Sequence, residues 1–248
     1  MSRVVSAART YSFQNREVKL PVVVRRAASA NATYVVPARA AQALLGQGDL
    51  AVAEIAPGRT LFSIAAIDYQ DNDLGDYNEV SLALFVREAR DRPAIPYLSN
   101  VAAFFRGALP TYIHRLPVDQ SFTCDAGRGI WGFPKTIEHI DFVHEDGSAT
   151  CKLTCDGVHV LTLTVATGGK QTLPQRSMTT YSRLDGVTHK TEFVSGAEQV
   201  GFRLGGAELI LGNHPIAAEL ASLGLPKSAL LSVWMGNMYG RFEAPAPI

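Results

Sequence analysis

A lysine that follows a proline-broken apolar stretch is the first residue whose surroundings could support chemistry. In Ala126–Thr136, AGRGIWGFPKT, bulky apolar residues lead to Pro134 and then to Lys135. Pro134 has no N–H and a fixed φ, so it interrupts a regular hydrogen-bond ladder just before the lysine. A water-poor pocket lowers the pKa of a lysine and frees the neutral amine, which attacks carbonyl carbons. We therefore predict a nucleophile at Lys135; the plainer alternative is a strand-end lysine in solvent.

Four segments of the chain, in the same order, resemble the acetoacetate decarboxylase superfamily. AGRGIWGFPK resembles its active-site segment, in which a Gly-Arg pair, apolar residues and an aromatic-Pro-Lys triplet lead to the Schiff-base lysine. The other three segments are FQNRE (Phe13–Glu17), LGDYNE (Leu74–Glu79) and HPIAAELASLGLPKS (His214–Ser228). FQNRE resembles a segment that carries a substrate-site arginine, here Arg16. LGDYNE resembles a segment that carries an active-site acid, here Glu79.

The resemblance implies that Lys135 forms an imine with the carbonyl group of a small oxo acid. The iminium is an electron sink, which stabilises a carbanion at the neighbouring carbon. Glu79 would carry protons to and from the substrate, and Arg16 would orient a carboxylate or hold Glu79 in place. Since the lysine itself supplies the electron sink, no metal or organic cofactor is expected. On residue type alone, Glu79 at the start of a strand would be solvated.

Two positions depart from the decarboxylases of the superfamily. A second lysine directly follows the Schiff-base lysine in those enzymes, whereas this chain has Thr136 there. A second family glutamate would fall near Ser63–Ala66, where no carboxylate is present. The superfamily also includes members that condense pyruvate with aldehydes and dehydrate the product. We therefore expect a lyase on a small 2-oxo or 3-oxo acid, with an aldehyde as co-substrate, and favour aldolase or dehydratase chemistry over acetoacetate decarboxylation.

Three alternatives stay open at this point. The chain could be an acetoacetate decarboxylase, a barrel that binds a small molecule without turnover, or a hydrolase or tautomerase that uses Glu79 without an imine. Retention of Arg16, Glu79 and Lys135 argues against the binding protein, whereas the loss of two charged groups of the family supports it.

Further side chains are candidates for binding the substrate. Trp131 and Phe133 flank the lysine segment and would wall the pocket. Tyr77 and Tyr239 would donate hydrogen bonds from their hydroxyl groups. Arg128 could clamp a carboxylate, because a guanidinium fork matches a carboxylate in two places. For each of these side chains, a role in packing or structure is the plainer alternative.

Composition argues against several classes of partner. Basic and acidic side chains balance at 23 each, which does not favour a nucleic acid or an anionic membrane surface. The first residues lack the apolar core of a signal peptide, and no stretch approaches the ~20 apolar residues of a membrane span. Cys124, Cys151 and Cys155 have no metal-binding spacing and are expected to be free thiols of a cytoplasmic protein. The low charged fraction, 19%, weakly favours a homo-oligomer.

Hydrophobic patterns and turns predict one mostly β domain over residues 1–248. Strands are expected at Val18–Arg26, Leu61–Tyr69, Val80–Arg87, Ile137–Val143, Ala149–Cys155, Val158–Thr167, Thr188–Val194, Gly201–Leu211 and Ser232–Phe242, and helices at Pro37–Leu45 and Pro215–Leu223. Asp-Gly turns join three of these strands into an antiparallel meander. Gly168–Ser177 and the C-terminal EAPAPI are expected to be irregular. The fold class is thus α+β, mostly β; the resemblance implies a closed antiparallel β-barrel with a few peripheral helices and the lysine inside.

Overall fold

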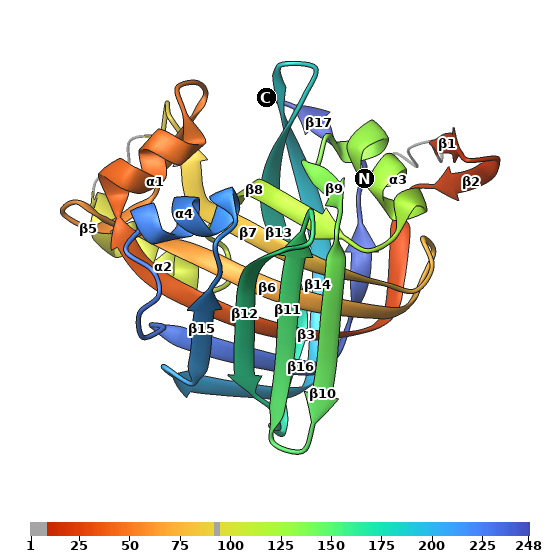
Figure 1. Ribbon diagram of the computed structural model, residues 1–248. Coiled ribbons are helices and arrows are strands. Elements are labelled where there is room, and N and C mark those ends of the chain that lie inside the picture. Colours follow the sequence, from red (N-terminus) through yellow and green to blue (C-terminus); the bar gives the residue numbers. More distant parts are fainter. Residues whose placement is uncertain (1–8, 92–94) are drawn as a thin grey trace.

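Seven strands pair in a closed ring in the computed structural model, which describes residues 9–91 and 95–248 (Figure 1). The order around the ring is β7, β6, β3, β16, β14, β13, β8 and back to β7. The bounds are β3 (Val22–Pro37), β6 (Arg59–Asn72), β7 (Tyr77–Glu88), β8 (Thr111–Val118), β13 (Gln171–Leu184), β14 (Val187–Leu204) and β16 (Leu231–Phe242). The mostly β class expected from the sequence is confirmed.

One pairing in the ring departs from the expected all-antiparallel arrangement. β8 and β13 run parallel, whereas the other ring neighbours are antiparallel. Parallel neighbours need a long crossover connection rather than a hairpin. A helix and a three-stranded meander lie between β8 and β13 in the sequence and provide this crossover.

A four-stranded sheet covers one side of the ring and crosses its strands (Figure 1). Its order is β10 (His139–Glu145), β11 (Ser148–Cys155), β12 (Val158–Ala166) and β15 (Ala207–Leu211). The first three strands form the predicted antiparallel meander. The expected strand Gly201–Leu211 is divided between β14 and β15, because Gly205 and Gly206 both have positive φ values and turn the chain.

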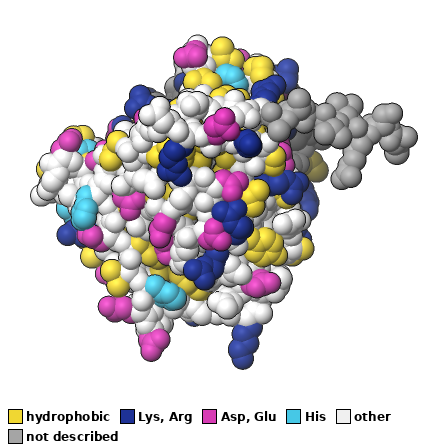
Figure 2. Space-filling view, turned by 90° about the vertical axis from the view of Figure 1, so that its right-hand side faces the viewer, with side chains coloured by type: hydrophobic (Ala, Val, Ile, Leu, Met, Phe, Trp, Pro, Cys, Tyr) yellow, Lys and Arg dark blue, Asp and Glu magenta, His cyan; other side chains and the backbone are white. Residues whose placement is uncertain are grey.

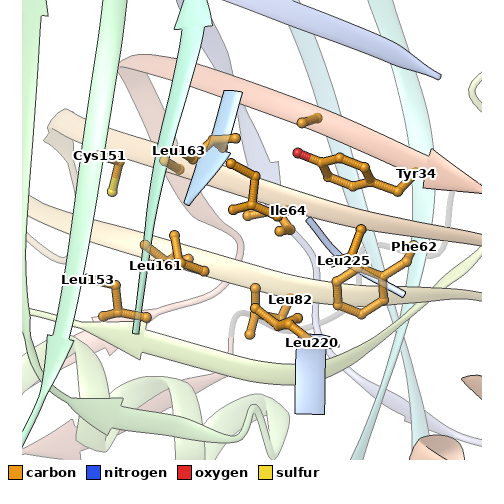
Figure 3. Packing of buried hydrophobic residues seen from close by; sticks show 14 of the residues in the cluster. Tyr34, Phe62, Ile64, Leu82, Cys151, Leu153, Leu161, Leu163, Leu220 and Leu225 are labelled. Atoms are coloured by element: carbon orange, nitrogen blue, oxygen red, sulfur yellow. The ribbon is translucent and has the colours of Figure 1, made fainter. Parts of the chain in front are cut away.

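The two faces of each ring strand serve different purposes. Outward-facing Ile64 and Leu82 pack with Leu153 and Leu161 of the outer sheet in the main core (Figure 3). Because successive side chains of a strand point to opposite faces, the residues between these outward positions point into the ring. Ser63 and the other inward residues therefore line its interior.

In the described part of the chain, four helices lie outside the ring: α1 (Ala38–Leu45), α2 (Pro96–Phe105), α3 (Ser121–Trp131) and α4 (Pro215–Ser222) (Figure 1). The predictions of α1 and α4 are confirmed to within one residue at each end. α3 was not predicted, because it contains Gly127 and Gly129 and glycine disfavours a helix interior. Gln120 caps its start by accepting a hydrogen bond from the Thr123 N–H, and Gly132 ends it in the left-handed conformation.

The remaining strands are short: β1 (Thr10–Phe13), β2 (Arg16–Lys19), β4 (Leu50–Val52), β5 (Glu54–Ala56), β9 (Lys135–Ile137) and β17 (Ala246–Pro247). Two segments expected to be irregular are partly strands. β13 begins at Gln171, where pairing with β14 overrides the polar sequence, and β17 in the C-terminal tail pairs with β14. The predicted absence of a signal peptide concerns mainly residues 1–8, which lie outside the described residues.

The surface of the molecule reflects its balanced composition. On the face shown in Figure 2, acidic and basic side chains are interspersed, and apolar side chains are scattered among them. Over residues 9–91 and 95–248, none of the helices combines the length and apolar character needed to cross a bilayer.

Candidate active site

A buried ion pair joins Lys135 and Glu79, which the sequence analysis had singled out. Nζ of Lys135 lies 2.8 Å from Oε2 of Glu79, and the residues are only 4% and 5% exposed. Both residues are positioned by β8. The strand β7, which carries Glu79, pairs with one edge of β8, and β9, which carries Lys135, pairs with the other. Glu79 lies opposite Val118, and Lys135 lies opposite Leu116. The spacing between the two charged groups is thus fixed by sheet hydrogen bonding rather than by a loop.

Helix α3 shapes the space around the lysine side chain. A Cβ atom at Gly127 would lie 2.5 Å from Cδ of Lys135, so only glycine leaves room for that side chain. One turn earlier on the same helix, Thr123 accepts a hydrogen bond of 3.0 Å from Nζ of Lys135. Sequence reasoning missed Thr123. Its spacing of four from Gly127 would have been a signal once residues 121–131 had been recognised as a helix.

Two stacked tyrosines complete the shell around the ion pair. The rings of Tyr69 and Tyr77 lie 4.6 Å apart, and Nζ of Lys135 is 4.9 Å from the centre of the Tyr77 ring. The Tyr69 hydroxyl lies 3.5 Å from Oε1 of Glu79. Burial raises the pKa of Tyr77 to about 12 and that of Tyr69 well above its usual range, so both hydroxyls stay protonated and can donate hydrogen bonds. Tyr77 was predicted at the site, whereas Tyr69 was not.

The charge state of Lys135 differs from the prediction. Burial favours the neutral amine, but the Glu79 carboxylate and Tyr77 act in the opposite direction and hold the pKa of Lys135 above its ordinary value. The resting lysine is therefore an ammonium ion paired with Glu79. The prediction of a lowered pKa considered the apolar neighbours alone and missed the counter-charge that the fold brings to the amine.

The ion pair faces a cavity of about 350 Å³ inside the ring. Trp131 and Phe133 line it, as predicted, and their rings stack with centroids 5.7 Å apart. Methionines and further aromatic residues make most of the wall apolar. Among the described residues that line the cavity, Lys135 carries the single basic group and Glu79 the single acidic group.

Three predicted site residues lie elsewhere. Arg16 is exposed, and its guanidinium stacks 3.8 Å above the ring of Phe122 instead of reaching Glu79. Arg128 is an exposed residue of α3 that lines a second, polar cleft outside the ring. Tyr239 approaches Gly196 of β14 and is not among the lining residues. The expected arginine clamp for a carboxylate is thus not formed in this cavity.

Metal-binding chemistry finds no support among the described residues. Residues 9–91 and 95–248 contain no cluster of three or more histidine, cysteine or acidic side chains that could hold a metal ion. Cys124, Cys151 and Cys155 are buried free thiols, and burial raises the pKa of Cys151 to about 12. These thiols are consistent with a structural role.

Comparison with known proteins identifies relatives of this architecture. Residues 10–240 match the family model described as acetoacetate decarboxylase. The crystal structure of acetoacetate decarboxylase from Legionella pneumophila is similar with a TM-score of 0.67 at 15% identity, covering 100% of this chain and 91% of that chain. The enduracididine biosynthesis enzyme MppR complexed with pyruvate is similar with a TM-score of 0.60 at 14% identity, covering 92% and 90%.

A third similar structure is an acetoacetate decarboxylase-like enzyme from Sphingomonas wittichii RW1, with a TM-score of 0.59 at 15% identity, covering 93% of this chain and 94% of that chain. Among curated protein sequences, none matches this chain. At these identities the structural likenesses show a shared fold.

Proposed function

Since the chain belongs to the acetoacetate decarboxylase family, we propose that it is a Schiff-base-forming lyase that acts on a small 2-oxo or 3-oxo acid through Lys135. The observation that carries this proposal is the buried pair of Lys135 and Glu79, which faces an otherwise uncharged cavity. Such a pair supplies both groups that imine chemistry needs, an amine and a proton acceptor beside it.

The first step is the release of the amine from its ammonium form. Glu79 accepts a proton from Nζ of Lys135 across their 2.8 Å contact and becomes a neutral acid. The free amine attacks the substrate carbonyl carbon, the C=O π bond breaks, and its oxygen takes up a proton. Loss of water from this carbinolamine gives the iminium. Glu79 returns its proton to the departing hydroxyl, so water leaves and Glu79 is again a carboxylate beside the iminium.

Two outcomes follow from the iminium, and the proposal favours the condensation. Glu79 takes a proton from the α carbon, the resulting enamine attacks an aldehyde to form a carbon–carbon bond, and Glu79 gives the proton to the new alkoxide. Loss of water and hydrolysis of the imine complete the reaction. In the alternative, a 3-oxo acid loses carbon dioxide, and Glu79 relays a proton from water to the enamine carbon. MppR, a structural neighbour, has been seen with the condensation product of pyruvate and imidazole 4-carboxaldehyde. A cavity of about 350 Å³ is also larger than pyruvate alone requires.

Borohydride trapping tests the proposal directly. Incubation with pyruvate and borohydride is expected to add a single reduced adduct, mapped to Lys135 by intact mass and peptide analysis. Lys135→Ala should abolish it, and Lys135→Met provides a second variant that fills the space of the side chain with an apolar chain. An adduct on a different lysine, or none with any of several oxo acids, would refute the assignment.

The choice between the two outcomes needs a second measurement on the same preparation. Carbon dioxide release from acetoacetate is compared with the condensation of pyruvate and an aromatic aldehyde. We expect condensation to be faster. Brisk release of carbon dioxide without condensation would instead establish the decarboxylase alternative.

A further inference from the structure

The cavity continues beyond the ion pair as a channel with ordered rows of small side chains. Strand register places Glu79 in one row with Ile67 and Ser29. In the next row, Ser81 lies opposite Ala65, and Ala65 lies opposite Asn31 on its other side. Two residues along a strand advance about 7 Å, so the row of Ser81 lies about 7 Å beyond Glu79.

A third row adds the hydroxyl of Ser63. Ser63 lies opposite Ala83 and lines the cavity about 13 Å beyond Glu79 along the strands. Phe85 follows two residues after Ala83, and its ring packs edge-on against Phe104 of α2 with centroids 5.4 Å apart. This aromatic pair borders the two polar rows, and Thr111, which lies opposite Phe85, also lines the cavity.

The polar groups in these rows are available to a ligand. The Asn31 side-chain amide donates to Ser29 at 3.0 Å and to the Val233 carbonyl at 3.4 Å, and its Oδ1 accepts no hydrogen bond from another described residue. The side-chain hydroxyls of Ser63 and Ser81 form no hydrogen bond with another described residue, although both residues line the cavity inside the ring. Neither row contains a charged side chain among the described residues that line the cavity. A group bound here would therefore be polar and neutral, because a charge would have no partner.

We propose that these rows, Asn31, Ser63 and Ser81, form a distal subsite that binds a neutral hydrogen-bonding group at the far end of an elongated carbonyl substrate. The inference rests on the proposed function, because it takes Lys135 as the point where the carbonyl group reacts. It names the substrate class more narrowly: an aldehyde or oxo compound whose distal hydroxyl, amide or uncharged heterocycle lies about 7–13 Å from the reacting carbon. Short oxo acids such as pyruvate do not reach the rows.

Three synthetic methyl ketones of matched length test this subsite. The first carries a terminal hydroxyl, the second a methyl group in its place, and the third a terminal carboxylate. Each is long enough to reach from Lys135 to the row of Ser81. Calorimetric titration without a reductant gives their dissociation constants for the wild-type protein and for the Ser63→Ala/Ser81→Ala double variant. Thr150→Ala/Thr164→Ala is the matched control, since it removes a pair of hydroxyls that bond each other at 3.1 Å in the outer sheet.

We expect the wild-type protein to bind the hydroxy ketone and to bind the carboxylate analogue at least tenfold more weakly. In the Ser63→Ala/Ser81→Ala variant, the affinity ratio of hydroxy ketone to methyl analogue should fall about three- to tenfold, the loss expected for one neutral hydrogen bond. The control variant should keep the wild-type ratio. An unchanged ratio, equal binding of the carboxylate, or no binding of any ketone would overturn the subsite.

The two proposals fail in different experiments. The affinity ratio of hydroxy ketone to methyl analogue does not depend on imine formation, because it compares the equilibrium binding of two ligands that differ only in the distal group. Trapping of pyruvate needs no distal group, because pyruvate is too short to reach it. If no pyruvate adduct forms but the affinity ratio behaves as expected, the lyase proposal is refuted and the subsite stands. If the adduct forms but the affinity ratio is unchanged in the double variant, only the subsite is refuted.

Discussion

At the scale of single residues, the charge of Lys135 depends on the balance between burial and Glu79. Burial alone would lower the pKa of the amine, but the carboxylate and Tyr77 outweigh it. The raised pKa keeps the amine protonated at neutral pH, so imine formation in the wild-type protein should accelerate as pH rises through the alkaline range. The Glu79 carboxylate keeps the resting amine protonated, and it is also the nearest acceptor for the proton of that amine.

Glu79→Gln separates these two effects. Without the carboxylate, burial is left as the main influence, so the pKa of Lys135 should fall and the midpoint of the trapping profile should shift to lower pH. Turnover should nevertheless drop about 10²–10⁴-fold, as is typical when a general acid or base is lost. Trapping rates with pyruvate over a range of pH, together with turnover on a verified substrate, provide the measurement. Wild-type turnover, or a midpoint that moves upward, would contradict this role of Glu79.

Thr136 provides a second prediction at the residue scale. A lysine follows the Schiff-base lysine in decarboxylases of the family, which suggested that its absence here limits decarboxylation. Thr136 is exposed and lines the outer cleft, whereas the Lys135 side chain points into the ring. Thr136→Lys should therefore place its ammonium outside the cavity and leave carbon dioxide release from acetoacetate within about twofold of wild type. A large increase would mean that a cation at this position reaches the amine after all.

At the scale of elements, α3 determines whether the amine is presented correctly. Gly127→Ala would place a methyl group 2.5 Å from Cδ of Lys135 and push the side chain away from Glu79 and Thr123. Such a displacement of a reacting group can cost about 10²-fold in rate. Gly129→Ala is the matched control: it gains the same helix propensity, but its methyl group meets the ring of Phe13, 2.5 Å away, instead of the lysine. Pyruvate trapping rates and thermal melts compare the two, and equal trapping in both variants would argue against this role of Gly127.

The same helix shows where sequence reasoning reached its limit. Local signals predicted the meander of β10, β11 and β12, because Asp-Gly turns and alternating apolar residues act within a few positions. α3 could not be read in this way, because its glycines are there for tertiary contacts with Lys135 and Phe13 and oppose the local preference. Lys135 and Glu79 were found through motifs. Thr123 could be identified only once α3 was recognised as a helix. The rows of small inward residues could be identified only from strand register, which no local pattern specifies.

At the scale of the whole molecule, the ring needs support on its outer face, because its interior is hollow. The outer sheet provides this support through a core in which Leu161 is fully buried and lies opposite Leu153 and Leu211 (Figure 3). The empty space of the cavity contributes no packing, so the main core has to provide much of the free energy of unfolding. Stability and ligand binding are thus assigned to opposite faces of the same strands.

Leu161→Ala tests this division. Removing a buried leucine side chain should lower the free energy of unfolding by about 2–5 kcal/mol, measured by denaturant titration. The control is Leu204→Ala, because Leu204 is 87% exposed and its loss should change stability by less than about 0.5 kcal/mol. Below the unfolding transition, both variants should still form the pyruvate adduct, since Leu161 faces away from the cavity. A loss of less than about 1 kcal/mol in Leu161→Ala would show that the outer sheet does not unfold together with the ring. A loss of trapping in the folded variant would show that the two faces are coupled.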